Sequence, residues 1–186
     1  MQNFHKHIVV FAGNECRQEK EEHYYSLAYD MGMLLSKEGF VVVTGGGPGL
    51  MNEVMRGAYE SKGRTIGICL AVAGRIQSKF ITKRYMFRSL HSRIKKLIGI
   101  GDHFIAIPGG VGTTTEIMTV LDLKRRKKIS QKQKLILVDA YYHEFESLIE
   151  KMKKEGFAGD DIDSFYTVVK DPFAAIEILK HADSQI

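Results

Sequence analysis

Residues 103–116 read HFIAIPGGVGTTTE, which places an apolar strand pattern, a glycine-rich turn and a helix start in direct succession. Glycine allows left-handed backbone angles and close approach to a ligand. The first turn of a helix presents N–H groups without helical partners and the positive end of the helix dipole. A strand, a glycine turn and a helix in this order therefore predict a site for phosphate or another anion.

The rest of the chain repeats this alternation. Apolar strand patterns also occur at 7–13, 40–44, 64–70, 134–139 and 165–169. Helical periodicity follows at 23–40, 50–63, 84–101, after 112, at 141–157, and after an N-cap at Asp171. Strands that are apolar throughout are buried on both faces, so the pattern predicts an α/β fold, a Rossmann-like doubly wound parallel sheet with helices on both faces. The stretch 71–83 fits neither kind of element.

Length and composition predict one domain spanning residues 1–186, because 186 residues suffice for one core but are few for two. No apolar run approaches the roughly 20 residues of a membrane helix, and no secretory signal pattern opens the chain, so a cytoplasmic protein with no membrane partner is expected. Two cysteines and seven scattered histidines indicate reduced thiols and neither metal nor cofactor.

The net charge of +5 and the run KRRKK at 124–128 raise the alternative of nucleic-acid binding. This run falls where the helix after TTTE should end, and cations there complement the helix dipole. No aromatic residues alternate with it to stack on bases. A solvated helix end is therefore expected, and no nucleic-acid partner.

Two glycine turns, 45–49 and 109–112, follow strands, and ligands of open α/β sheets lie beyond the carboxyl ends of the strands. Neither turn matches a dinucleotide fingerprint or a P-loop, and the simpler alternative is tight packing of strand against helix. Two such turns favour a nucleotide or sugar phosphate. The predicted phosphate contacts are Gly45, Gly46, Gly47, Gly49, Gly109, Gly110, Gly112 and Thr113. Other substrate contacts are predicted at Gly13, Asn14, Met51, Asn52 and Thr114.

Glu116 allows two interpretations. Thr113 and Glu116 have the spacing of a capping box, in which the glutamate only stabilises the start of its helix. Glu116 also shares a helical face with Val120 and Leu123, which turns it toward the sheet or the crevice. Arg93 lies at the edge of the apolar face of the preceding helix, where an arginine is more often a surface residue than part of a site. That face is predicted to comprise Met86, Leu90, Ile94 and Leu97.

The segments GGGPGLMNEVMRGA at 45–58 and PGGVGTTTE at 108–116 resemble the paired motifs of the LONELY GUY family. Its members are cytokinin riboside 5′-monophosphate phosphoribohydrolases, often mislabelled as lysine decarboxylases. The resemblance extends from about Ile8 to Phe157 and implies Arg93 and Glu116 as the catalytic pair, and a homodimer. Ile94 and Asn52 depart from the family pattern and leave the preferred base open.

The resemblance implies hydrolysis of the N-glycosidic bond of a purine nucleoside 5′-monophosphate, AMP or an N6-substituted AMP, to the free base and ribose 5-phosphate. Glu116 would stabilise positive charge on the ribose and guide water. The stretch 71–83, including Gly74, Arg75 and Gln77, is expected to shape the base pocket. The alternative is a non-catalytic carrier of a phosphate-bearing ligand such as molybdenum cofactor. No lysine stands in a context typical of a decarboxylase cofactor.

Overall fold

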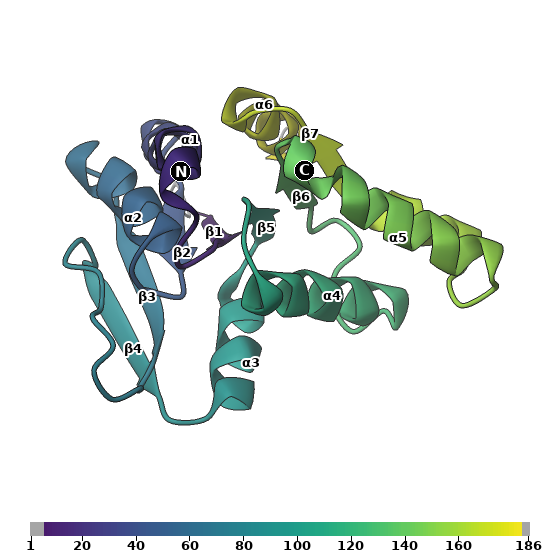
Figure 1. The fold of residues 1–186 in the computed structure, drawn as a ribbon, viewed down its shortest axis with the longest axis horizontal. Coiled ribbons are helices and arrows are strands. Elements are labelled where there is room, and N and C mark those ends of the chain that lie inside the picture. Colours follow the sequence, from purple (N-terminus) through teal and green to yellow (C-terminus); the bar gives the residue numbers. More distant parts are fainter. Residues whose placement is uncertain (1–5, 184–186) are drawn as a thin grey trace.

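The protein, analysed as a computed structural model that describes residues 6–183, contains one seven-stranded sheet in the order β4-β3-β2-β1-β5-β6-β7 (Figure 1). Every neighbouring pair of strands is parallel. The strands are β1 His7–Phe11, β2 Val41–Thr44, β3 Thr65–Leu70, β4 Lys83–Phe87, β5 His103–Ala106, β6 Leu135–Val138 and β7 Thr167–Val169. This arrangement confirms the predicted doubly wound α/β fold.

Helices cover both faces of the sheet (Figure 1). They are α1 Glu21–Lys37, α2 Leu50–Glu60, α3 Leu90–Ile100, α4 Val111–Arg125, α5 His143–Lys154 and α6 Pro172–Asp183, with short 3-10 turns η1 Gln18–Lys20, η2 Ala140–Tyr142 and η3 Asp160–Phe165. Ile8 and Val10 of β1 pack with α1, α2 and α6, while Val9 and Phe11 pack with α3, α4 and α5. Both sides of each central strand are buried, which explains why these strands are apolar throughout.

The start of the predicted helix 84–101 is wrong. Residues 83–87 form the edge strand β4, which pairs with β3, and α3 begins only at Leu90. Met86, expected on the apolar face of the helix, lies on β4 and is half exposed. Edge strands commonly carry cations and exposed side chains, and Lys83 and Arg84 gave this strand a polar pattern that merged with the helix after it.

The predictions for two helix ends, the start of α6 and the end of α4, have different outcomes. Asp171 caps α6 as predicted, because its Oδ1 accepts the N–H of Ala174 at 2.9 Å. The predicted solvated end of α4 is wrong for Lys124, which is buried. Its Nζ donates to the carbonyl oxygens of Gln131 and Gln133, 3.2 and 2.6 Å away. Burial also lowers the pKa of Lys124, so this lysine is a structural group that ties α4 to the following loop.

The order of the strands reverses between β1 and β5, which lie side by side at the middle of the sheet. In open α/β sheets, the crevice beyond the carboxyl ends of the strands at such a switch point is where ligands bind. The loop after β1 contains Gly13 and Asn14, and the loop after β5 contains Pro108 and Gly109. The topology therefore brings both segments to one place.

Candidate active site

A cavity of about 460 Å³ opens at this switch point. It is enclosed by the segments that follow β1, β3 and β5 and by the first residues of α2, α3 and α4. Its walls are Ala12, Gly13, Asn14, Glu15, Met51, Leu70, Arg75, Leu90, Arg93, Gly110, Gly112, Thr113 and Glu116. The N-terminus of α4 contributes Gly112 and Thr113, so N–H groups without helical partners border the cavity.

Arg93 and Glu116 form an ion pair in the wall of this cavity. Arg93 Nη1 donates to Glu116 Oε1 at 3.2 Å, and the two side chains are only 11% and 9% exposed. Arg93 Nε also donates to the carbonyl oxygen of Ile68 on β3 at 2.9 Å. The guanidinium is therefore held by the sheet and in turn holds the carboxylate in a defined orientation.

Burial and the ion pair act on Glu116 in opposite directions. Removal from water disfavours the charged carboxylate and raises the pKa of Glu116, while the positive charge and hydrogen bond of Arg93 lower it. Burial is the larger effect, so the pKa of Glu116 lies above the usual value for glutamate. A buried carboxylate with a raised pKa and one cationic partner is typical of catalytic sites.

The capping-box interpretation of Glu116 is wrong. Helix α4 begins at Val111 with Gly110 at its N-cap, and no side chain caps it. Thr113 is therefore the third helical residue, and Glu116 lies in the second turn, too far along the helix to bond an N-cap amide. Because Glu116 does not cap the start of α4, its carboxylate is available to the cavity.

The first glycine turn lies behind the cavity wall and makes room for neighbouring groups. A Cβ at Gly45 would overlap Nη2 of Arg93, and a Cβ at Gly47 would lie 2.9 Å from Nη2 of Arg75. The N–H of Gly46 donates to Thr44 Oγ1 at 2.9 Å. The absence of side chains at Gly45 and Gly47 therefore leaves room for Arg93 and Arg75, two arginines that line the cavity.

Gly45→Ala is expected to displace the guanidinium of Arg93 from Glu116 and to lower catalytic turnover about 10- to 100-fold, because small misplacements of a catalytic group have effects of this size. The added methyl group meets the ends of two side chains, Arg93 and Met51, and no backbone atom, so the urea midpoint of unfolding should change little. Steady-state kinetics and urea unfolding of the same preparation check both statements. Unchanged turnover would contradict the role of Gly45.

The predicted site residues fall into two groups. Eight line the cavity, namely Gly13, Asn14, Met51, Arg93, Gly110, Gly112, Thr113 and Glu116. The others lie outside its walls. Gly45, Gly46, Gly47 and Gly49 form the turn behind it, Asn52 donates to Glu53, and Gly109 and Thr114 line a neighbouring groove. Contact of any of them with phosphate stays a prediction.

Sequence patterns missed several wall residues. Arg75 is not one of these, because it was expected to shape the pocket and does line the cavity, where its Nη2 donates to Asn14 Oδ1 at 3.1 Å. Glu15 also lines it and could have been found, because it stands in the loop directly after β1. Leu70 and Leu90 could not be recognised as wall residues from the sequence, since apolar side chains at these positions are expected to lie in the core. Arg75 brings a second cation to the cavity.

Two kinds of feature are absent from residues 6–183. No group of three or more histidine, cysteine, aspartate or glutamate side chains gathers in a geometry that could hold a metal ion. None of the helices in this range combines the length and apolar character needed to cross a membrane.

The cavity lies at the switch point of a parallel α/β sheet, with a helix N-terminus beside it and a buried Arg–Glu pair in its wall. These features are typical of a protein that binds an anionic ligand. The sequence model of a family described as "possible lysine decarboxylase" matches residues 51–179. The chain belongs to this family, the LONELY GUY family.

Individual relatives agree with this placement. The chain is 30% identical over 155 residues to a cytokinin riboside 5′-monophosphate phosphoribohydrolase of Arabidopsis thaliana, covering 82% of this chain and 71% of that protein. It is 28% identical to one from Rhodococcoides fascians, covering 94% of this chain and 89% of the other. Among solved structures, the molybdenum cofactor carrier protein of Chlamydomonas reinhardtii superposes with a TM-score of 0.72 at 20% identity, covering 97% and 99% of the two chains. At that identity the last likeness concerns the fold alone.

Proposed function

We propose that the protein hydrolyses the N-glycosidic bond of a purine nucleoside 5′-monophosphate, AMP or an N6-substituted AMP, and releases the base and ribose 5-phosphate. The observation that carries this proposal is the buried Arg93–Glu116 pair beside the N-terminus of α4. The named activity of the relatives supports it.

In this reaction the N–H groups of residues 110–113 bind the 5′-phosphate, which fixes the ribose without taking part in the chemistry. As the bond between C1′ and the base nitrogen lengthens, positive charge develops on the ribose, and the Glu116 carboxylate stabilises it. Glu116 then accepts a proton from the water that attacks C1′, and the leaving base nitrogen takes up a proton from the solvent. Glu116 afterwards returns its proton to the solvent, so that in total one water is divided between C1′ and the base. Arg93 keeps Glu116 ionised and oriented.

The pH dependence of turnover should reflect Glu116. The ionised form is the active one, so kcat is expected to fall as the pH drops through a pKa that burial has raised above the usual glutamate value. Arg93→Gln removes the positive charge that lowers this pKa, so the acidic limb of the profile should move to higher pH, and kcat at neutral pH should fall at least tenfold. Profiles of both proteins and of Arg125→Gln, an exposed control, check this. An acidic limb that stays in place in Arg93→Gln would contradict the assignment.

The proposal is tested by incubating the protein with a panel of nucleoside 5′-monophosphates and following base release by chromatography, with Glu116→Gln prepared identically to exclude a contaminating hydrolase. The carrier alternative predicts no base release from any substrate and a pterin that co-purifies and is detected by mass spectrometry. Absence of lysine among the described wall residues disfavours decarboxylation through a lysine-linked cofactor.

A homodimer, expected from the resemblance, is part of the proposal. Leu90 and Val111 stand at the start of α3 and α4 next to the cavity, and their side chains are 54% and 85% exposed. Large apolar groups of this exposure are suited to contact with a second copy. Sedimentation equilibrium measures the assembly directly.

A further inference from the structure

Asp139 has an unusual backbone conformation at the carboxyl end of β6. Lys62, Lys127 and Asp139 are the residues other than glycine within the described range that have positive φ. The first two have φ near 60°, which polar residues adopt at helix ends. Asp139 has φ 95° and ψ 150°, a region that is nearly exclusive to glycine. Such a conformation persists only where the surroundings impose it.

Several hydrogen bonds hold Asp139 in this conformation. Its N–H donates to the carbonyl oxygen of Val169 on β7 at 2.9 Å. Its Oδ1 accepts the N–H of Tyr141 at 2.8 Å, and its Oδ2 lies 2.8 Å from His23 Nε2 on α1. Asp139 therefore links β7 and α1 to the short turn η2, which carries Tyr141.

Tyr141 reaches from this turn to the second glycine turn. Its hydroxyl donates to the carbonyl oxygen of Gly109 at 2.7 Å. The peptide between Gly109 and Gly110 is trans, so its C=O and N–H point in opposite directions. When the carbonyl is drawn toward Tyr141, the N–H of Gly110 points away from Tyr141. Gly110 borders the cavity together with Thr113 and Glu116, and it also borders the grooves beside Tyr141.

The two glycines of this peptide differ in their packing. A Cβ at Gly109 would overlap the side chain of Thr113, so Gly109 is closely packed. A Cβ at Gly110 would meet no atom within 4 Å, and the same holds for Gly112. A glycine in open space has wide conformational freedom. The hydrogen bond from Tyr141 therefore adds a contact that restrains the peptide plane on its carbonyl side.

We propose that Tyr141 is a positioning residue, held by Asp139, whose hydroxyl orients the Gly109–Gly110 peptide so that the Gly110 N–H binds the phosphate of the substrate. This inference rests on the proposed function, which supplies the phosphate. It goes beyond that function because it assigns a role to residues outside the cavity wall.

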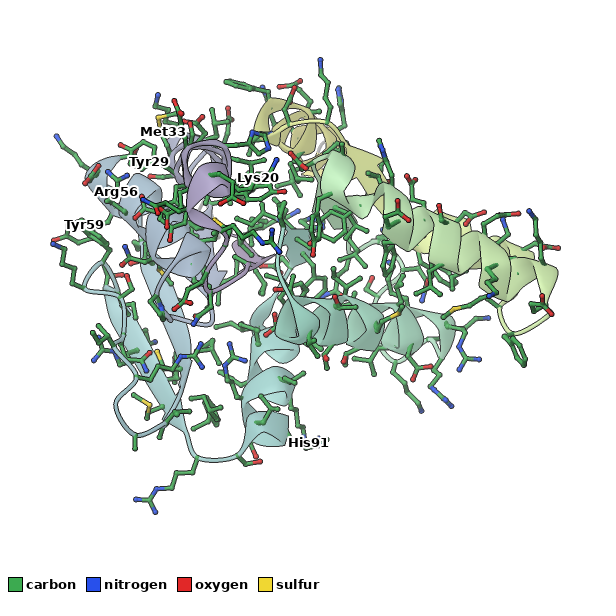
Figure 2. The ribbon with its side chains drawn as sticks, viewed as in Figure 1. Lys20, Tyr29, Met33, Arg56, Tyr59 and His91 are labelled. Atoms are coloured by element: carbon green, nitrogen blue, oxygen red, sulfur yellow. The ribbon has the colours of Figure 1, made fainter. Side chains whose placement is uncertain are left out.

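Tyr141→Phe removes only the hydroxyl from a side chain that is about half exposed. The KM for the nucleoside monophosphate is expected to rise about tenfold, as for loss of one well-placed hydrogen bond, while kcat changes less than twofold. Tyr29→Phe is the matched control, because the Tyr29 hydroxyl donates to Glu60 at 3.0 Å on the side of α1 and α2 (Figure 2). That variant should keep both constants. An unchanged KM in Tyr141→Phe would overturn the inference.

A binding measurement separates this inference from the proposed reaction. Inorganic phosphate is titrated into ¹⁵N-labelled protein, and the Gly110 amide signal is followed by NMR. A saturable shift of that signal, with affinity about tenfold lower in Tyr141→Phe, supports the positioning role even if neither protein releases a base, in which case only the proposed hydrolysis fails. Equal phosphate affinity in both proteins overturns the positioning role, whatever the hydrolytic activity.

Discussion

Glu116→Gln is expected to lower kcat for base release about 10³-fold or more. Glutamine keeps the shape and an oxygen that can accept the hydrogen bond of Arg93, but it can neither carry the negative charge that stabilises the developing ribose cation nor accept a proton from water. Positioned acid–base groups and preorganised charges each contribute roughly 10²- to 10⁴-fold. Single-turnover kinetics with saturating substrate measure the loss in the chemical step.

The fold of this variant should remain intact, because glutamine fills the same space and its side-chain oxygen can still accept the hydrogen bond of Arg93. A far-UV circular dichroism spectrum checks the fold. Glu177→Gln on α6 is a suitable control, since Glu177 is exposed and pairs only with Lys180 of its own helix among the ion pairs described for it. Wild-type turnover in a folded Glu116→Gln protein is incompatible with the proposed mechanism.

Gly49→Ala is expected to have the largest effect on stability, lowering the free energy of unfolding by about 3 kcal/mol. Gly49 has φ 65°, and a Cβ there would overlap the backbone carbonyl group of Asn14. Backbone atoms cannot move aside as the end of a side chain can, so the loop after β1 and the start of α2 must separate. Both segments line the cavity, so turnover should fall as well.

Urea unfolding monitored by circular dichroism measures this change. The control is Gly99→Ala on α3, where a Cβ would meet no atom within 4 Å. Alanine is a better helix former than glycine, so Gly99→Ala should stabilise the protein by up to about 1 kcal/mol. A midpoint for Gly49→Ala equal to that of the wild type would show that the loop after β1 does not pack against this turn.

The regular elements of the sheet could be predicted because their signals are local. A central strand of a doubly wound sheet is apolar on both faces, and each helix of the fold has an apolar stripe with a period of 3.6 residues. The edge strand β4 could not be recognised this way, since it has one neighbour and keeps Arg84 and Met86 exposed. The burial of Lys124 could not be predicted either, because it depends on a loop that folds back over the end of α4.

The site could be predicted in part. The resemblance indicated Arg93 and Glu116, but the residues around them left Arg93 as a possible surface residue and Glu116 as a possible helix cap. Their contact across 23 positions of sequence depends on Gly45, which makes room for the guanidinium, and on Ile68, which accepts its hydrogen bond. None of these contacts between distant residues produces a periodicity or a spacing that can be recognised in the sequence.

The sequence by itself determined the alternation of strands and helices, and with it the parallel sheet and the position of the glycine turns at the carboxyl ends of the strands. These features follow from short-range backbone preferences and apolar periodicity. Only the tertiary structure decided which groups face the cavity: the Arg93–Glu116 pair, Arg75 from an irregular loop, and the contact from Tyr141 to Gly109. Ion pairs and hydrogen bonds between distant segments depend on where the packed core places each backbone, and that placement is a property of the whole chain.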